Sequence, residues 1–374
     1  MRIAVIGAGL TGLSVAALLL KLGIRAEVFE RADGPVDSGS GIYVWPQGAQ
    51  IMRFLAGDDD LLERGHAVEY FQTNNRYGEE LHQTAVRLAE FDFSQPAMMY
   101  VRGTLLAALR ALLETDQLSF GKACIAVDDN GPDVTVCFAD GTESRFDLVI
   151  GADGIHSAVR NSVHPKISVV DSGVAAARGL VAFDCRLLRR DLCQIFAFDT
   201  SRLVSYPLSP TRDDRYWFLA YPHHHKPLMD REALIRHCSA LRDPLPDFVR
   251  RTPEDVILSH PLLDLEQNHE WYYGRVVLVG DSAHGVLPTL GYGYTLGLEN
   301  GFALVQALLS SRQGDIEGAL RRYRRRVAGR SREMAQVMRD ITRLFYFDGE
   351  AAVNTKSLEP IYADFRKLAR STVF

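Results

Sequence analysis

Short apolar runs and helix-forming segments alternate along the first third of the chain. The run RIAVIG is apolar, rich in β-branched residues and ends in glycine, as a buried parallel strand does. A helix is expected over 10–22, and a second strand, AEVFE, ends at Glu30. These segments predict a βαβ unit at the start of the chain. Further helices are expected over 46–56 and 103–114.

Strand-like patterns dominate the middle of the chain. DVTVCFADG alternates as one limb of a hairpin, and FDLVIGADG contains another buried strand. Between about 169 and 260, the segments AARGLVAFDC, QIFAFD, RLVSYPLS and RYWFLAYP follow one another with turns between them, which predicts a separate, mostly antiparallel sheet. The buried strand GRVVLVGD comes next, and helix-forming sequence then runs over 294–347.

The order of these patterns predicts an α/β fold. We expect a Rossmann-like nucleotide-binding domain with an inserted, mostly antiparallel β-sheet substrate domain and C-terminal helices. The expected division is 1–168 and 263–345 for the two parts of the nucleotide-binding domain, 169–262 for the substrate sheet and 346–374 for a C-terminal helical segment. Residues 70–97 are candidates for additional strands of the substrate sheet.

Composition narrows the class of protein. The chain has 374 residues, 47% of them hydrophobic, and a net charge of −5, so no general attraction to nucleic acids or membrane surfaces is expected. Five cysteines without CxxC spacing argue against a disulfide framework or a structural zinc site and indicate a reducing cytoplasm. The apolar stretch LSVAALLL follows a glycine-rich turn and is too short to span a bilayer, so neither export nor a membrane span is expected.

The sequence GAGLTG over 7–12 is a GxGxxG motif between the first strand and the first helix. There the first glycine permits a tight turn, the second lets the backbone approach a pyrophosphate, and the third lets the helix pack on the strand. The helix N-terminus adds N–H groups and a partial positive charge. Glu30 is suited to accept hydrogen bonds from ribose hydroxyls. This arrangement predicts dinucleotide binding.

Two further aspartates follow buried strands. GADGIHS begins at Gly151 and contains Asp153, and GDSAH begins at Gly280 and contains Asp281. Each aspartate stands at the carboxyl end of a strand, where open α/β sheets bind ligands. Taken alone, each stretch is equally well explained as a strand followed by a capped turn.

Together, GxGxxG, GADGxxSxVR and GDSAHxxxPxxGxG resemble, in this order, the motifs of class A flavoprotein monooxygenases of the p-hydroxybenzoate hydroxylase fold. The resemblance covers nearly the whole chain and extends to the loop GSGI at 39–42 with Pro46, and to Arg102 ahead of a leucine-rich helix. It implies that the dinucleotide is FAD. The absence of a second GxGxxG fits a nicotinamide, NADH or NADPH, that binds transiently, as in this family.

The resemblance also implies roles for individual residues. Asp281 would bind the ribityl chain or the diphosphate region, and Asp153 lies in the motif associated with FAD and reduced nicotinamide. Pro288 would lie beside the isoalloxazine ring, and the turn from Gly291 to Gly293 would present backbone N–H groups to the flavin N1 and C2 carbonyl, where reduced flavin is negative. The expected cofactor-binding residues are Gly7, Gly9, Leu10, Thr11, Gly12, Glu30, Arg31, Gly41, Ile42, Arg102, Asp153, Asp281, Pro288, Gly291, Gly293, Tyr294 and Thr295.

The reaction that the resemblance implies is hydroxylation of a small aromatic or heteroaromatic compound. NADH or NADPH would reduce FAD, reduced flavin and O₂ would form a C4a-hydroperoxide, and its distal oxygen would pass to an electron-rich ring. Alternatives are a flavin-dependent halogenase, an isoprenoid or quinone-pathway hydroxylase, and a non-enzymatic flavin-binding redox module. None of Trp45, Trp217 and Trp271 stands in the halogenase signature WxWxIP, whereas GLEN weakly resembles the GLRD of quinone-pathway enzymes.

The predicted sheet is expected to roof the flavin and to form the substrate pocket. The candidate pocket residues are Arg178, Arg202, Tyr206, Tyr216 and Tyr221, and strand alternation allows about half of them to point inward. A tyrosine or arginine there would stabilise the anion of a phenol or carboxylate and raise ring nucleophilicity. Arg178, Tyr206, Tyr216 and Pro288 are therefore the expected catalytic residues, the alternatives being sheet packing for a tyrosine and solvent-exposed charge for an arginine.

No metal site is expected. His223, His224 and His225 are consecutive, so they cannot all face one ion, and no carboxylate-rich cluster lies near them in the sequence. The arginine-rich segment 321–330 indicates a solvated helix face. The expected partners are an aromatic substrate and O₂, without nucleic acid or membrane, and the protein is expected to be a monomer or homodimer.

The segment LPTLGYGYTLGLEN departs from the family pattern. Tyr292, Tyr294, Thr295 and Asn300 stand where the family usually has glutamine, a small or aliphatic residue, asparagine and aspartate. Two roles are possible for each tyrosine ring. It either packs under the following helix or lines the flavin or substrate cavity.

Overall fold

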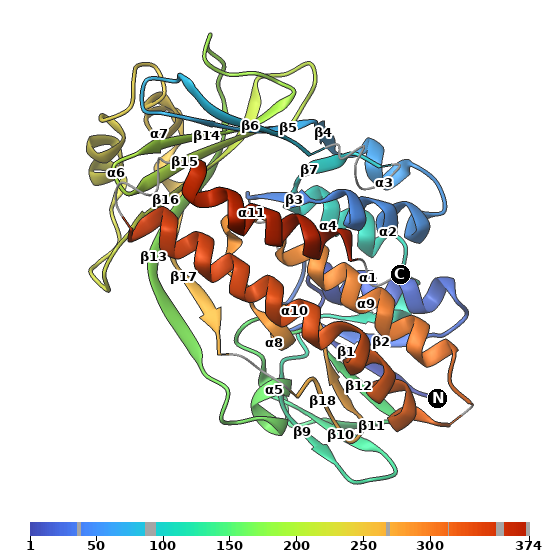
Figure 1. Cartoon of the computed structure of the whole chain (residues 1–374). Coiled ribbons are helices and arrows are strands. Elements are labelled where there is room, and N and C mark those ends of the chain that lie inside the picture. Colours follow the sequence, from blue (N-terminus) through green and yellow to red (C-terminus); the bar gives the residue numbers. More distant parts are fainter. Residues whose placement is uncertain (36–38, 87–94, 267–269, 313, 349–354, 372–374) are drawn as a thin grey trace.

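The computed structural model describes residues 1–35, 39–86, 95–266, 270–312, 314–348 and 355–371. Two sheets lie toward opposite ends of the molecule, and two long helices, α10 (Ile316–Tyr346) and α11 (Thr355–Arg370), pack together and run diagonally across it (Figure 1). Within the described residues, no helix is long and apolar enough to cross a membrane.

A six-stranded sheet forms the core of the N-terminal part. Its order is β18-β19-β12-β1-β2-β8, and all neighbouring strands are parallel except β18 and β19. Every residue of β1, β12 and β19 is buried, which explains why the sequence shows them as continuous apolar runs. The strands are β1 (Ile3–Ile6), β2 (Ala26–Phe29), β8 (Leu118–Ser119), β12 (Leu148–Gly151), β18 (Tyr272–Tyr273) and β19 (Val276–Leu278).

The helix of the first βαβ unit, α1 (Leu10–Lys21), packs against α4 (Arg102–Arg110) and α9 (Gly293–Leu309). Because β19 and α9 come from late in the chain, segments on both sides of the inserted sheet complete the N-terminal unit.

The second large sheet has seven strands in the order β17-β13-β16-β15-β14-β5-β6. Only the β14–β5 pair is parallel among the pairings of this sheet in the described chain. The expected α/β fold with a mostly antiparallel inserted sheet is therefore confirmed. The strands are β5 (Tyr70–Asn74), β6 (Glu80–Ala85), β13 (Val169–Ala182), β14 (Leu192–Phe198), β15 (Ser201–Pro207), β16 (Asp214–Pro222) and β17 (Leu258–Leu265).

Smaller elements surround the two sheets. One three-stranded sheet consists of β9 (Cys124–Asp129), β10 (Val134–Phe138) and β11 (Glu143–Phe146), and another of β3 (Gly41–Val44), β7 (Ala97–Val101) and β4 (His66–Val68). The remaining helices are α2 (Pro46–Ala56), α3 (Asp60–Glu63), α5 (Ala158–Val163), α6 (Arg231–Cys238), α7 (Asp247–Arg251) and α8 (Asp281–His284), with 3-10 turns η2 (Thr115–Gln117), η3 (Glu254–Val256) and η4 (Pro288–Leu290).

The helical sequence expected over 294–347 is divided into α9 and α10. Gly314 has a φ of +86°, in the left-handed region that a glycine adopts without steric cost. Asp315 then caps α10, because its side chain accepts a hydrogen bond from the Gly318 N–H at 2.9 Å. A break and a new N-cap inside the polar segment therefore separate the two helices.

A buried ion pair joins α9 to α10. Glu299 is fully buried, and its Oε2 lies 2.6 Å from Nη1 of Arg330. Arg330 also donates to the Tyr292 hydroxyl at 2.9 Å and, through Nε, to the Leu368 carbonyl at 3.0 Å. Although burial alone would lower it, the Glu299 carboxylate raises the pKa of Arg330, so the guanidinium stays charged. One arginine thus links α9, α10 and α11.

We expect Glu299→Gln to destabilise the fold strongly. The substitution leaves the Arg330 charge buried without its carboxylate, and breaking a buried pair in this way costs about 3–5 kcal/mol. Urea unfolding would measure the loss. The control is Glu317→Gln, because Glu317 forms an exposed pair with Arg321 on α10 and should change stability by less than about 1 kcal/mol. Equal losses in the two variants would contradict the role of the buried pair.

Candidate active site

A cavity of about 860 Å³ lies between the carboxyl ends of the six-stranded sheet and one face of the seven-stranded sheet. Its walls include the glycine turn after β1, residues of β13, β15 and β16, and side chains from α10 and α11. Cavities for small molecules commonly measure about 300–1,000 Å³, so this one is at the large end of that range.

Most of the residues predicted for the site line this cavity. They are Gly7, Gly9, Leu10, Thr11, Glu30, Arg31, Gly41, Ile42, Arg102, Asp153, Arg178, Tyr206, Tyr216, Asp281, Pro288, Gly291, Gly293 and Tyr294. Gly12 and Thr295 are not among the lining residues. Gly12 packs against the Gly7 backbone, and the Thr295 hydroxyl accepts a hydrogen bond from the Trp45 N–H at 3.0 Å.

The glycine turn leaves room beside its second glycine. A Cβ on Gly7 would lie 2.5 Å from the Ala152 carbonyl oxygen, and a Cβ on Gly12 would lie 1.9 Å from the Gly7 carbonyl oxygen. A Cβ on Gly9 would meet no atom within 4 Å. The first and third glycines are therefore required by packing, whereas the second keeps the cavity edge open for a ligand.

The start of α1 supports an anion at this edge. Its N-cap, Gly9, makes no side-chain capping bond, and its first turn contains no acidic residue. Such a helix end offers backbone N–H groups and a partial positive charge to a phosphate. Glu30 stabilises the turn beside it, because its carboxylate accepts from the Ala8 N–H at 2.8 Å and from the Ala32 N–H at 3.0 Å.

Asp153 is partly engaged by its own turn. Its carboxylate accepts hydrogen bonds from the Ser157 hydroxyl and, at 3.1 Å, from the Val159 N–H. Burial raises the pKa of Asp153, and these hydrogen bonds act in the opposite direction. The buried Arg160 then joins this turn to the start of α8, donating to the Ile155 and Ser282 carbonyls. Sequence reasoning did not single out Arg160, although it is the last residue of GADGxxSxVR.

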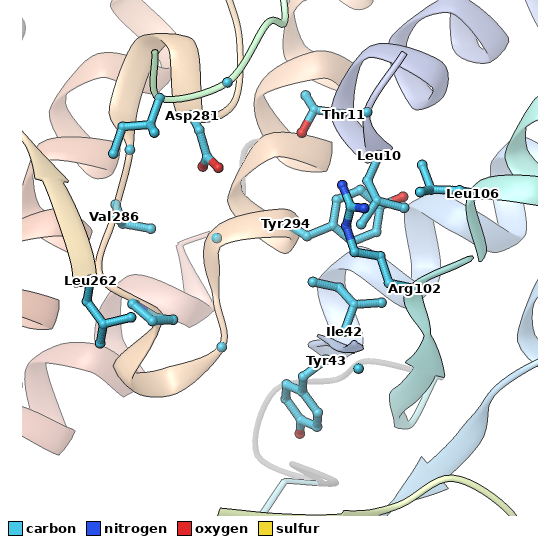
Figure 2. Close-up of a pocket in the computed structure, with 18 of the residues that line it drawn as sticks. Leu10, Thr11, Ile42, Tyr43, Arg102, Leu106, Leu262, Asp281, Val286 and Tyr294 are labelled. Carbon is cyan, nitrogen blue, oxygen red and sulfur yellow. The ribbon is translucent and has the colours of Figure 1, made fainter. Parts of the chain in front are cut away.

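Asp281 and Arg102 face the same cavity from different elements. Figure 2 shows Arg102 beside Tyr294 and Leu10, with Asp281 directed into the same space. The Asp281 side chain is accessible from the cavity although it lies deep inside the molecule. Its deep position raises the pKa of Asp281, and the positive charge of Arg102 opposes that shift.

The segment from Pro288 to Gly293, named here the 288–293 turn, brings backbone to the cavity. Pro288 begins a 3-10 turn, Gly291 is left-handed with a φ of +63°, and α9 starts at Gly293. No side chain caps this start of α9, and its first turn has no acidic residue. The turn therefore has the form expected of a backbone site for a negatively charged ring edge.

The two tyrosines of this segment have different positions. Tyr294 lines the cavity, and its hydroxyl forms a hydrogen bond with the Ser14 hydroxyl at 2.9 Å. Tyr292 is fully buried outside the lining, where its hydroxyl contacts Arg330 and Glu299. Packing thus explains Tyr292, whereas Tyr294 contributes to the cavity wall.

Strand alternation decides which substrate-side candidates reach the cavity. On β16, Tyr216 lines the cavity, whereas Tyr221 packs in the core on the opposite face and its hydroxyl accepts from the Met229 N–H. The two residues are an odd number of positions apart, so they point to opposite faces. Arg178 of β13 and both Arg202 and Tyr206 of β15 also line the cavity.

The residues of this wall contact one another. Tyr206 and Tyr216 are paired across β15 and β16, with ring centroids 6.1 Å apart, and the Tyr43 ring lies 5.6 Å from that of Tyr206. Burial raises the pKa of Tyr216 to about 12, although the positive charge of Arg178 works against the shift. Tyr216 is therefore a neutral phenol near pH 7.

Three polar atoms on the substrate side are buried and have no hydrogen-bond partner among the described residues. They are Nε of Arg178, Nδ1 of His260 and the hydroxyl of Tyr43, and all three residues line the cavity. Burial and the charge of Arg178 lower the pKa of His260 to about 4, so its ring is neutral near pH 7. Sequence reasoning missed His260 and Tyr43, because nothing local marks either residue as cavity-facing.

Comparisons with known proteins agree with this geometry. A family model described as an FAD binding domain matches residues 1–338. The chain is 34% identical over 330 residues to a 3-amino-4-hydroxybenzoate 2-monooxygenase of Streptomyces cremeus, covering 86% of this chain and 82% of that protein. It is 28% identical over 353 residues to a 6-hydroxynicotinate 3-monooxygenase of Bordetella bronchiseptica, covering 91% of each.

A solved structure of HpxO from Klebsiella pneumoniae, in complex with FAD and uric acid, superposes with a TM-score of 0.89. Its sequence is 26% identical, and the match covers 99% of this chain and 97% of that chain.

The chain therefore belongs to the FAD binding domain family. Within it, the protein is a class A FAD-dependent monooxygenase that hydroxylates a small aromatic or heteroaromatic compound, with NADH or NADPH as the co-substrate typical of these enzymes. The family resemblance, the enzyme class and the cofactor expected from the sequence are thus confirmed.

The residues present fit FAD. The open space at Gly9 and the uncapped start of α1 suit the pyrophosphate, and Glu30 lines the cavity beside this turn. The 288–293 turn and Arg102 are suited to the flavin end. When bound, FAD supplies the electron transfer from the nicotinamide and the activation of oxygen.

Two single substitutions in the glycine turn test this placement of FAD. Gly9→Ala should keep the stability of the FAD-free protein, because its Cβ meets no atom within 4 Å, yet weaken FAD binding by at least about tenfold. Gly12→Ala should instead lower the stability of the FAD-free protein by about 1–3 kcal/mol, because its Cβ overlaps the Gly7 carbonyl. Quenching of flavin fluorescence measures binding, and thermal unfolding measures stability. Normal FAD affinity in Gly9→Ala would rule out a pyrophosphate at this glycine.

Proposed function

We propose that the substrate is a small aromatic anion, a carboxylate or phenolate, bound between the 288–293 turn and the wall of Arg178, Tyr206 and Tyr216. The observation that carries this proposal is the Arg178 guanidinium, which lines the cavity and whose buried Nε–H has no acceptor among the described residues. A hydrogen bond to a charged group contributes about 1.5–3 kcal/mol. An anionic oxygen of the substrate would pair with the part of the guanidinium that faces the cavity.

The neighbours of Arg178 support the same assignment. Neutral His260 adds no positive charge beside Arg178, so on this side of the cavity the Arg178 guanidinium would pair with the anion. Tyr216 lines the same wall, and its hydroxyl would add a neutral hydrogen-bond donor beside the guanidinium. Tyr206 would act through ring contacts with Tyr43 and Tyr216. Stabilising a phenolate in this way raises the electron density of its ring.

Names of relatives support an anionic aromatic substrate. The Streptomyces relative is named for an aminohydroxybenzoate and the Bordetella relative for a hydroxynicotinate, so both names describe an aromatic ring with a carboxylate and a hydroxyl. We extend that chemistry to this chain because Arg178 offers a charged donor for the carboxylate or phenolate.

We assign the remaining roles as follows. Leu10 and Thr11 would bind the pyrophosphate through backbone N–H groups, Glu30 and Arg31 would face the ribose, and Asp153 would lie near the diphosphate. Asp281 and Arg102 would contact the ribityl and flavin region, together with Gly41 and Ile42. Pro288, Gly291, Gly293 and Tyr294 would border the isoalloxazine ring. O₂ would be the oxidising co-substrate.

The proposal also covers the domain division, the cellular compartment and the assembly of the chain. We assign 1–168 and 263–345 to the FAD-binding domain, except that β5 and β6, within 70–97, join the substrate sheet of 169–262. We assign 346–374 to a C-terminal helical segment, of which Tyr362, Phe365 and Arg366 line the cavity. The five cysteines are free, which supports a reducing cytoplasm as the working compartment. A monomer or homodimer is the proposed assembly.

Substitutions on β13 and on the two faces of β16 test the substrate wall. We expect Arg178→Met to lower kcat/KM for the substrate by about 10–100-fold, because a hydrogen bond to a charged group contributes about 1.5–3 kcal/mol. Tyr216→Phe should act in the same direction with a smaller effect. Substrate-stimulated oxidation of NADH or NADPH measures both. The matched control is Tyr221→Phe, on the opposite face of the strand, which should retain wild-type kcat/KM. Wild-type turnover in Arg178→Met would contradict the anion site.

A substrate screen tests the charge requirement. Aromatic carboxylates and phenols should accelerate NADH or NADPH oxidation, whereas matched carboxamides and methyl esters should not, because neutral groups do not pair with Arg178. Mass spectrometry under ¹⁸O₂ should show one labelled oxygen in the product. Equal stimulation by the neutral analogues would remove the anionic substrate class while leaving the monooxygenase assignment intact. Turnover only with prenylated quinone precursors would instead favour the quinone-pathway alternative.

A further inference from the structure

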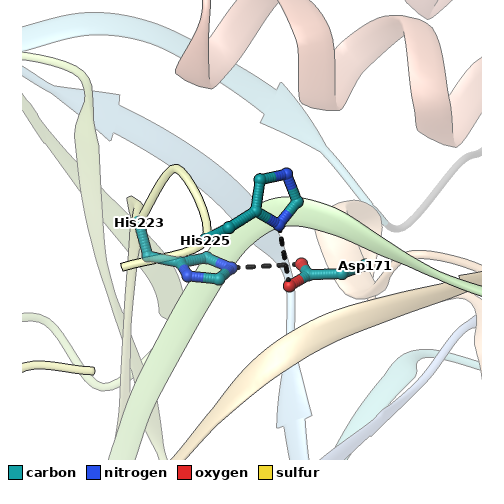
Figure 3. Close-up of side chains that lie close together, drawn as sticks. All are labelled: Asp171, His223 and His225. Carbon is teal, nitrogen blue, oxygen red and sulfur yellow. Dashed lines mark hydrogen bonds and ion pairs between the residues drawn. The ribbon is translucent and has the colours of Figure 1, made fainter. Parts of the chain in front are cut away.

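Three side chains outside the cavity gather where β13 passes the end of β16. His223 Nε2 lies 3.1 Å from Oδ1 of Asp171, and His225 Nδ1 lies 3.2 Å from Oδ2 of the same carboxylate (Figure 3). One potential ligand atom from each residue lies within 4.8 Å of the others. None of the three residues lines the cavity described above.

The backbone of the turn makes this arrangement possible. His224 and His225 have φ values of 48° and 59°, a left-handed conformation that is uncommon for residues other than glycine. The turn directs the rings of His223 and His225 toward Asp171, whereas the ring of His224 packs against Phe347 at 6.1 Å. The sequence alone predicts no metal site, because three consecutive histidines cannot all face one ion and no carboxylate-rich cluster lies near them in the sequence. Two histidines and a distant aspartate form the cluster instead.

The Asp171 side of the cluster is also held in place. β13 has a register shift between Asp171 and Ala175, and Asp171 Oδ1 accepts a hydrogen bond from the Gly173 N–H at 2.9 Å. The carbonyl of Gly173 in turn accepts from the His223 N–H at 2.9 Å. Hydrogen bonds therefore hold the irregular part of β13 and the turn that contains His223 and His225 in place relative to each other.

Both ring nitrogens of His223 face oxygen acceptors. Nδ1 lies 3.2 Å from the Lys226 carbonyl, and Nε2 lies 3.1 Å from the Asp171 carboxylate. A neutral imidazole has one N–H, so it can donate to only one of them. A histidine that donates Nδ1–H to a backbone carbonyl presents the Nε2 lone pair, which is the usual arrangement around a metal-bound histidine. A cation between Nε2 and the carboxylate would satisfy both groups.

We propose that Asp171, His223 and His225 form a binding site for Zn²⁺, with water completing the coordination. Two imidazoles and one carboxylate match the ligands of zinc sites that keep an open position. Tetrahedral Zn²⁺ with bonds of about 2.0–2.1 Å places its ligand atoms about 3.4 Å apart. The two nitrogen–oxygen separations here are 3.1 and 3.2 Å, and all three ligand atoms lie within 4.8 Å of one another. Access is available because the His225 side chain is 67% exposed. Bound Zn²⁺ would crosslink β13 to the turn after β16, and this inference does not depend on the proposed substrate.

Calorimetric titration of the FAD-loaded protein with ZnCl₂, after dialysis against a chelator, tests the site. The wild-type protein should bind one Zn²⁺, and Asp171→Asn and His225→Asn should each raise the Kd at least about tenfold. Asn at 225 tolerates a positive φ, and Asn at 171 retains an acceptor for the Gly173 N–H. The matched control is His224→Asn in the same turn, which should bind Zn²⁺ as the wild type does.

Zn²⁺ should also raise the unfolding temperature of the wild type and of His224→Asn, but not that of the other two variants. The flavin absorbance of each variant verifies that the fold is retained. Absence of saturable Zn²⁺ binding, or wild-type affinity in both Asp171→Asn and His225→Asn, would overturn the proposal and leave an ion pair between Asp171 and a protonated histidine. Equal loss of affinity in His224→Asn would also overturn it.

Discussion

Contact between backbone segments sets the geometry of the cofactor end of the molecule. The loops after β1 and β12 approach so closely that a side chain on Gly7 would overlap the Ala152 carbonyl, and one on Gly12 would overlap the Gly7 carbonyl. This approach seats α1 against the sheet and directs its N-terminus into the cavity. Because backbone atoms make the closest contacts, the position of this helix end does not depend on the side chains that line the remaining walls.

Sequence reasoning was accurate where structure depends on neighbours in the chain. The apolar runs gave β1, β12 and β19, and the helix expected over 46–56 is α2 (Pro46–Ala56). The same reasoning joined α9 to α10, because both segments favour helix and the break depends on a single glycine and the cap at Asp315. Local helix and strand propensity therefore predicted the elements themselves better than the boundary between two adjacent helices.

Contacts between distant segments decided the rest of the candidate site. Strand alternation predicted that about half of the five substrate-side candidates would point inward, whereas all except Tyr221 line the cavity, because the face that each strand presents depends on which side the FAD-binding part occupies. The position of Tyr292 depends on Arg330 and Glu299, whose pairing across α9 and α10 has no local sequence signal. Arg160 likewise becomes informative only when the turns after β12 and β19 lie side by side.

The C-terminal helices form part of the cavity wall together with the inserted sheet. Phe345 of α10 and Phe365 of α11 line the cavity opposite strands that precede them by more than a hundred positions in the sequence. Gln47 of α2 donates to the Ala369 carbonyl at 2.9 Å, which fastens α11 to the FAD-binding part. A chimera that exchanged the inserted sheet alone would therefore transfer only part of the cavity wall. If the substrate binds in this cavity as proposed, the walls that meet it belong to α11 as well as to the inserted sheet.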